Sequence, residues 1–103
     1  MQTLLFTKQV KTYTVKCFQD ENGQQYFKCD CIYFKTSCLK RGVPCKHTLS
    51  VLFTQGDCLK WENLRSKYAK SKGLKSEVEA EMILGLALRQ NEQTTTQWFL
   101  ENR

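Results

Sequence analysis

An α+β fold is predicted by three features of the sequence. Residues 10–33 have a strand-like pattern on both sides of Asn22-Gly23, a dipeptide that favours an antiparallel hairpin. An apolar run at 49–53 is typical of a helix, and Ser76-x-x-Glu79 forms a capping-box pattern ahead of another apolar stripe. We therefore expect a β-hairpin followed by one helix, and then two C-terminal helices.

The composition sets the scale of the fold. The chain has 103 residues, 41% of them hydrophobic, which suits one small domain with a core. Such a domain buries only about two-thirds of its unfolded surface, so a bound metal ion would add to its stability. The first eight residues lack the apolar core of a signal peptide, and no run reaches the length of a membrane span. We therefore expect a reducing, intracellular setting in which the six cysteines favour metal over disulfides, the alternative reading.

The hairpin is expected to carry the first metal ligands. Tyr13, Val15 and Cys17 would share one face of its first strand, and the return strand would cover residues 25–33. Residues 1–9 show no strong pattern, so they are expected to form a short strand or an N-terminal arm.

Cysteine and histidine residues follow with the spacing of metal ligands. Cys29 and Cys31 are two residues apart, which places them on one face of a strand. Cys45 and His47 stand where a loop over 35–44 enters a helix predicted over 45–55. Three thiolates and one imidazole match tetrahedral zinc, and four protein ligands close its coordination sphere. We therefore expect one structural Zn²⁺.

The other cysteines are assigned different roles. Cys38 lies between the two ligand pairs, where we expect a loop thiol near the metal; the alternative is that it replaces His47 as a ligand. Cys17 and Cys58 are expected to pack as small apolar side chains.

The metal-ligand stretch resembles the SWIM zinc finger, which has the pattern Cys-x-Cys, a variable loop, and Cys-x-His running into a helix. The segment Gly42-Val43-Pro44-Cys45-Lys46-His47-Thr48-Leu49-Ser50-Val51-Leu52 is most similar to the version in Mutator-like transposases and the plant transcription factors derived from them. The loop is somewhat longer here than in that branch, and it contains Cys38. The resemblance covers residues 10–55 and implies a zinc-bound ββα finger that acts on DNA in the nucleus.

Positive charge is concentrated in residues 28–75. This segment holds eleven Lys and Arg against three Asp and Glu, a net charge of +8 before any metal is counted, whereas the whole chain is +6. The asymmetry suggests a surface for a polyanion, although a solvated cationic surface is the simpler alternative. Our candidates for phosphate contact are Lys35, Lys40, Arg41 and Lys46 around the metal loop, with Lys60, Arg65, Lys67, Lys70 and Lys72 along the next helix. Tyr33 and Phe34 would either stack on bases or pack in the core.

Two helices are expected within residues 56–103. Asp57 is a plausible N-cap for a helix over 58–71. Ser76 would cap the next helix, in which Gly85 would permit close approach of another backbone. The apolar tail Trp98-Phe99-Leu100 would dock on its own domain or anchor a protein partner.

Together these features predict a binding module and not an enzyme. The one histidine, His47, is already assigned to the metal, so no base is left for a cysteine nucleophile, and no metallohydrolase carboxylate pattern stands near it. The first hypothesis is a zinc-dependent DNA-binding module with an N-terminal segment (1–9), a SWIM-like finger (10–55) and a helical extension (56–103) packed on it. The alternative is a protein-interaction adaptor of SWIM type, for example in a homologous-recombination complex, with residues 76–90 and 98–100 as its contact surface. A third hypothesis is that the chain is part of a larger transposase-like protein.

Overall fold

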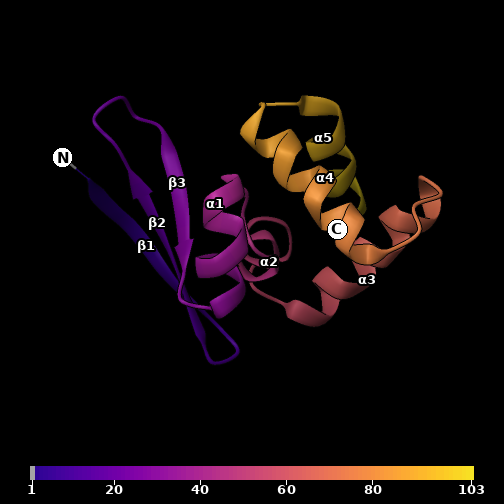
Figure 1. The fold of residues 1–103 in the computed structure, drawn as a ribbon, viewed down its shortest axis with the longest axis horizontal. Coiled ribbons are helices and arrows are strands. Elements are labelled where there is room, and N and C mark those ends of the chain that lie inside the picture. Colours follow the sequence, from indigo (N-terminus) through magenta and orange to yellow (C-terminus); the bar gives the residue numbers. More distant parts are fainter. Residues whose placement is uncertain (1) are drawn as a thin grey trace.

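A three-stranded antiparallel sheet lies on one side of a group of helices in the computed structural model, which describes residues 2–103 (Figure 1). The fold class is therefore α+β, as predicted. The strands are β1 (Thr3–Val10), β2 (Tyr13–Gln19) and β3 (Gln25–Cys29), in the order β1-β2-β3. The helical segments are η1 (Phe34–Cys38), α1 (Leu39–Arg41), α2 (Lys46–Thr54), α3 (Cys58–Ser71), α4 (Glu77–Arg89) and α5 (Gln93–Asn102). No helix within the described residues has the length and apolar character needed to cross a bilayer.

The sheet has one strand more than the predicted hairpin, and its last strand is shorter. Residues 1–9 were predicted to be either a short strand or an N-terminal arm, and most of them belong to β1. This strand pairs with β2 from Thr3 opposite Gln19 to Val10 opposite Tyr13. The return strand, expected over 25–33, ends at Cys29. Its ladder ends because the Asp30 carboxylate accepts a hydrogen bond from the Thr14 N–H, while the Asp30 N–H donates to the Thr14 carbonyl.

The expected loop over 35–44 is largely helical. The π-helix η1 continues directly into α1, and this helical piece turns its buried side chains, Phe34 and Cys38, toward the sheet-side residues. It ends at Gly42, whose φ of 68° lies in the left-handed region that favours glycine. The Val43 N–H then returns to the Cys38 carbonyl, closing the helix end.

The predicted helices α2, α3 and α4 form, and α3 and α4 have the expected N-caps. The Asp57 side chain accepts a hydrogen bond from the Lys60 N–H, and the Ser76 hydroxyl accepts one from the Glu79 N–H. Gly85 of α4 lies against the segment that precedes α2, and a Cβ atom at this position would meet the Val43 Cβ at 3.0 Å. The close approach expected at Gly85 is therefore present.

The prediction of two C-terminal helices is incomplete, because the tail forms a third one. Residues 93–102, read from the sequence as a polar linker and an apolar patch, form α5. Phe99 is 0% exposed and packs against Phe53, Trp61 and Tyr68. The Phe99 side chain is therefore used within the protein, which is the first of the two roles that the sequence allowed for the tail.

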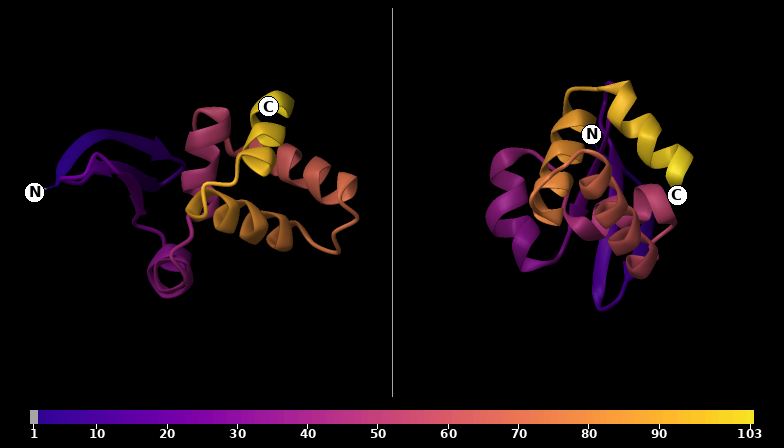
Figure 2. Two further views of the ribbon diagram at one scale, coloured as in Figure 1. Left: turned by 90° about the horizontal axis from the view of Figure 1, so that it is seen from above. Right: turned by 90° about the vertical axis from the view of Figure 1, so that its right-hand side faces the viewer.

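Two groups of buried residues stabilise the molecule. The helical core joins α2 to α5 and contains Leu49, Phe53, Trp61, Leu64, Tyr68, Ala69, Ala80, Leu84 and Phe99. The sheet-side core contains Val10, Val15, Cys29, Cys31, Phe34, Cys38, Val43 and Cys45. The helix α2 lies between the sheet and the helices α3 to α5 in two views (Figures 1 and 2). It supplies Leu49 and Phe53 to the helical core, and its partly buried Val51 packs against the sheet-side core.

Candidate metal centre

Three cysteines and one histidine converge where the sheet meets α2. Cys29 is the last residue of β3, Cys31 lies in the turn after it, Cys45 is the N-cap residue of α2, and His47 stands in the first turn of that helix. Their donor atoms all lie within 4.8 Å of one another, and all four residues are buried. Cys31 reaches the centre from a turn, not from the strand that the sequence predicted. These four residues could hold a metal ion.

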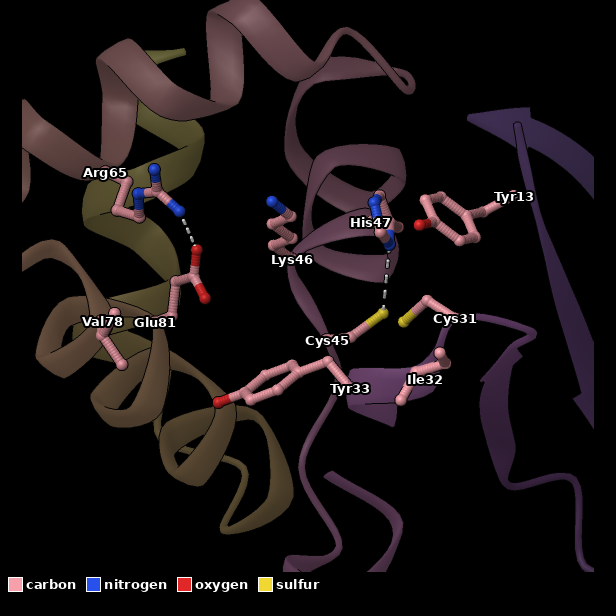
Figure 3. A pocket seen from close by; sticks show the side chains of 10 residues that line it. All are labelled: Tyr13, Cys31, Ile32, Tyr33, Cys45, Lys46, His47, Arg65, Val78 and Glu81. Atoms are coloured by element: carbon pink, nitrogen blue, oxygen red, sulfur yellow. Dashed lines mark hydrogen bonds and ion pairs between the residues drawn. The ribbon is translucent and has the colours of Figure 1, made fainter. Parts of the chain in front are cut away.

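The spacing of the donor atoms fits tetrahedral coordination. The Cys29 Sγ and His47 Nδ1 atoms are 3.7 Å apart, and the Cys45 Sγ and His47 Nδ1 atoms are 4.0 Å apart. A tetrahedral zinc ion with ordinary bond lengths places sulfur and nitrogen ligands about 3.6 Å apart. A small contraction would therefore bring these donors to coordination distance. Figure 3 shows the Cys31 and Cys45 sulfur atoms close together beside the His47 ring.

Burial favours the neutral form of three of the donors, Cys29, Cys45 and His47. It raises the pKa of the Cys29 thiol and of the Cys45 thiol, because a thiolate loses its hydration there. Burial also lowers the pKa of His47, and the charges of Lys46 and Lys11 act in the same direction. The neutral imidazole can coordinate directly, whereas the thiols must lose protons. Metal binding at this centre therefore releases protons and weakens as the pH falls.

Several neighbouring groups orient the donors. The Tyr13 ring packs on the His47 ring with centroids 4.4 Å apart. The Phe34 N–H donates to the Cys31 sulfur, and the Thr48 hydroxyl lies 3.5 Å from the Cys45 sulfur. Sequence reasoning assigned none of these three a role at the site. The face shared by Tyr13, Val15 and Cys17 was the one available signal, since it placed Tyr13 beside two residues that the structure buries.

Cys38 is not among the clustered donors. It is buried in the sheet-side core, and this burial, together with the nearby Cys45 and Cys31, raises the pKa of its thiol to about 11. The geometry therefore favours His47 as the fourth ligand and Cys38 as a packed thiol.

Cys38→Ser is expected to retain about one metal ion per chain and to lower the free energy of unfolding by about 1–3 kcal/mol, because a hydroxyl replaces a thiol in an apolar setting. Elemental analysis and urea unfolding of the metal-loaded protein would measure both quantities. Loss of the metal from a folded variant would instead place Cys38 among the ligands.

The candidate phosphate-contacting residues fall into two separate groups. Lys35, Lys40 and Arg41 are exposed on η1 and α1, and Lys46 is exposed between the ligands Cys45 and His47. A second exposed group, Lys60, Lys67, Lys70 and Lys72, belongs to α3 and its C-terminal end. At about 100° per residue, the first three of these lie roughly opposite Arg65 on the helix. Arg65 lines the pocket beside the metal centre together with Lys46, so the α3 lysines point away from that pocket.

Arg65 itself differs from the other candidates. Its guanidinium forms ion pairs with Glu77 and Glu81, and its side chain is largely buried. Burial disfavours its charge, but the two carboxylates outweigh this effect and raise the pKa of Arg65. Its charge is neutralised inside the protein, so we remove Arg65 from the phosphate-contacting set.

The aromatic candidates also separate. Phe34 is buried in the sheet-side core, which leaves only Tyr33 accessible for stacking. Tyr33 lines a pocket of ≈390 Å³ beside the centre, and Figure 3 shows the Arg65–Glu81 pair on the opposite wall. Phe34 was therefore a core residue, one of the two roles the sequence allowed.

Comparison of the chain with protein-family models, with curated proteins and with solved structures finds no match. Its class is defined by its own geometry: an α+β domain with a buried three-cysteine, one-histidine centre that could hold a metal ion.

Proposed function

We propose that the centre holds one structural zinc ion. Thiolate and imidazole donors suit zinc, and a full set of four protein ligands leaves no open position for substrate. The burial of all four donors supports a structural role, since solvent has little access to the ion. In this proposal the protein is not a metalloenzyme. Zinc, when bound, joins the end of β3 to the start of α2.

We further propose that the protein is a DNA-binding module of SWIM type that acts in the nucleus. The observation that carries this proposal is the position of four exposed cations relative to the metal ligands. Lys35, Lys40 and Arg41 lie on the helical piece that connects the two ligand pairs, and Lys46 lies between two ligands. The metal would therefore fix both ends of a cationic segment.

This arrangement suits phosphate contact more than base reading. Long cationic side chains on a fixed backbone can contact several phosphates, which gives affinity that depends on salt and little on sequence. The Arg89 guanidinium donates to the Arg41 carbonyl at 2.7 Å and so ties the C-terminal end of the segment to α4. The lysines of α3 point elsewhere and are secondary contacts in this proposal.

The test is fluorescence anisotropy of the zinc-loaded protein with duplex and single-stranded DNA. For four phosphate contacts on a duplex, we expect affinity to fall on the order of 10²-fold between roughly 50 and 200 mM salt. The triple variant Lys40→Gln, Arg41→Gln, Lys46→Gln should bind more weakly, and its salt slope should decrease by about three.

A matched control removes the same charge elsewhere. Lys16, Lys75 and Arg103 are exposed and lie outside the proposed surface, so changing all three to glutamine should leave the salt slope nearly unchanged. Equal losses in the two triple variants would show that only net charge matters. A folded, zinc-loaded protein that binds no DNA at low salt would overturn the proposal.

A further inference from the structure

A groove follows the free edge of β3, on the side of the strand away from β2. The strand order makes β3 an outer strand, and Figure 1 shows η1 and α1 running beside it. Residues 24–28 all line a pocket of ≈440 Å³, and Leu39 of α1 lines it as well. Side chains alternate between the two faces of a strand. A pocket that contacts five consecutive residues must therefore follow the strand edge and not one face of the sheet.

Backbone groups of β3 point into this groove. In an antiparallel pair, residues whose N–H and C=O groups face the partner alternate with residues whose groups face away. The Asp30 N–H donates to the Thr14 carbonyl, and the Asp20 N–H donates to the Gln24 carbonyl. Counting every second residue between Gln24 and Asp30, the backbone N–H and C=O groups of Tyr26 and Lys28 also face β2. The backbone N–H and C=O groups of Gln25 and Phe27 consequently face outward, where an added strand could pair with them.

The walls of the groove indicate the chemistry of an occupant. Its apolar side chains include Phe34, Val43, Leu52 and Leu88, and Leu39 is 60% exposed there. Its charged lining residues are Lys28 and Arg89, and no acidic residue of the described chain lines it. The Lys28 ammonium lies over the Phe18 and Tyr26 rings, at the rim of the groove and not on its floor. An occupant should therefore offer apolar side chains to the floor and negative charge to the rim.

We propose that this groove binds an extended acidic–apolar peptide segment of a partner protein, which adds to the sheet as a fourth strand beside β3. Backbone pairing with Gln25 and Phe27 would supply affinity, and the pockets for alternate side chains would supply selectivity. The five residues of β3 span about 17 Å, so a segment of about five residues fills the edge. None of the four proposed DNA-contacting cations lines this groove, although Lys40 and Arg41 follow Leu39 on α1, and the inference does not depend on DNA binding.

The test uses an acetylated, amidated six-residue peptide that alternates valine with glutamate and carries a fluorescent label. We expect saturable binding to the metal-loaded protein by anisotropy, and protection of the Phe27 amide from hydrogen exchange by NMR. A peptide that alternates valine with lysine should not bind, because Lys28 and Arg89 would repel it.

Two variants separate the groove from the rest of the surface. Leu39→Asp places a negative charge on the groove wall and should weaken binding by about tenfold or more. Leu59→Asp makes the same change at a more exposed leucine on α3, outside the groove, and should bind like the parent protein. Gln25→Pro removes one outward N–H at the first residue of an edge strand, a position that tolerates proline, and should also weaken binding.

Metal content and circular dichroism establish that each variant is folded. The proposal fails if the folded parent protein shows no saturable binding at about 1 mM peptide, a concentration that corresponds to only ~4 kcal/mol of affinity. It also fails if Leu39→Asp and Leu59→Asp bind equally. Protection of the Phe27 amide without peptide, in a protein that sediments as a dimer, would assign the edge to a second copy of this chain instead.

Discussion

Cys45→Ser is expected to abolish metal binding and to unfold the sheet-side core. Cys45 is 1% exposed and supplies one of the four donors, and a serine hydroxyl is a poor substitute for a thiolate on zinc. Structural zinc contributes about 10–16 kcal/mol of apparent binding free energy at neutral pH. Small domains have a net stability of only about 5–15 kcal/mol, so the loss is comparable to the whole.

The measurements are metal content, thermal unfolding by circular dichroism and amide hydrogen exchange. Exchange should become fast in β2, β3 and the first turn of α2. Cys58→Ser is the matched control, because Cys58 is only partly buried and lies outside the donor cluster. It should keep its metal and its Tm within a few degrees. A Cys45→Ser protein that lacks metal yet melts like the parent would refute a structural role for the ion.

Phe99→Ala is expected to lower the free energy of unfolding by about 3–5 kcal/mol, the usual range for emptying a buried aromatic site. The Phe99 ring contacts Trp61 and Tyr68 with centroids 5.5 and 4.7 Å away, so its removal leaves a cavity at the centre of the helical core. Urea unfolding of the metal-loaded protein, followed by tryptophan fluorescence, would measure the change.

Leu100→Ala provides the comparison on the same helix. Leu100 is 39% exposed, so its truncation should change the stability by about 0.5 kcal/mol or less. If the two variants were equally stable, α5 would not be docked in the core. The apolar tail would then again be free to contact a partner.

The cluster of four donor residues was predictable because it depends on spacings within a short segment of the chain. Cys29, Cys31, Cys45 and His47 are recognisable from their spacing alone, and the structure brings the same four donors together. The caps Asp57 and Ser76 were predictable for the same reason, since each acts on a backbone N–H three residues away. Features that depend on a few neighbouring residues can be predicted without knowledge of the fold.

The missed features depend on contacts between distant segments. Thr94, Thr95 and Thr96 have low helix propensity, so the local sequence did not predict α5. Burial of Phe99 outweighs this low propensity in the folded protein. Similarly, the sequence shows Arg65 as one more cation of α3, because its ion pair with Glu81 of α4 depends on how the two helices pack. Phe34 and Cys38 are one helical turn apart and both buried, a weak signal that the segment between the ligand pairs is helical.

The confinement of all four donors to residues 29–47 has a consequence for biosynthesis. Closing so short a loop loses little chain entropy, so an ion can organise this segment before the later helices exist. During synthesis from the N-terminus, this metal-bound segment would fold first, and α2 would present Leu49 and Phe53 as a packing surface for the helices that follow. The supply of metal during translation, more than its supply afterwards, would then set the yield of folded protein.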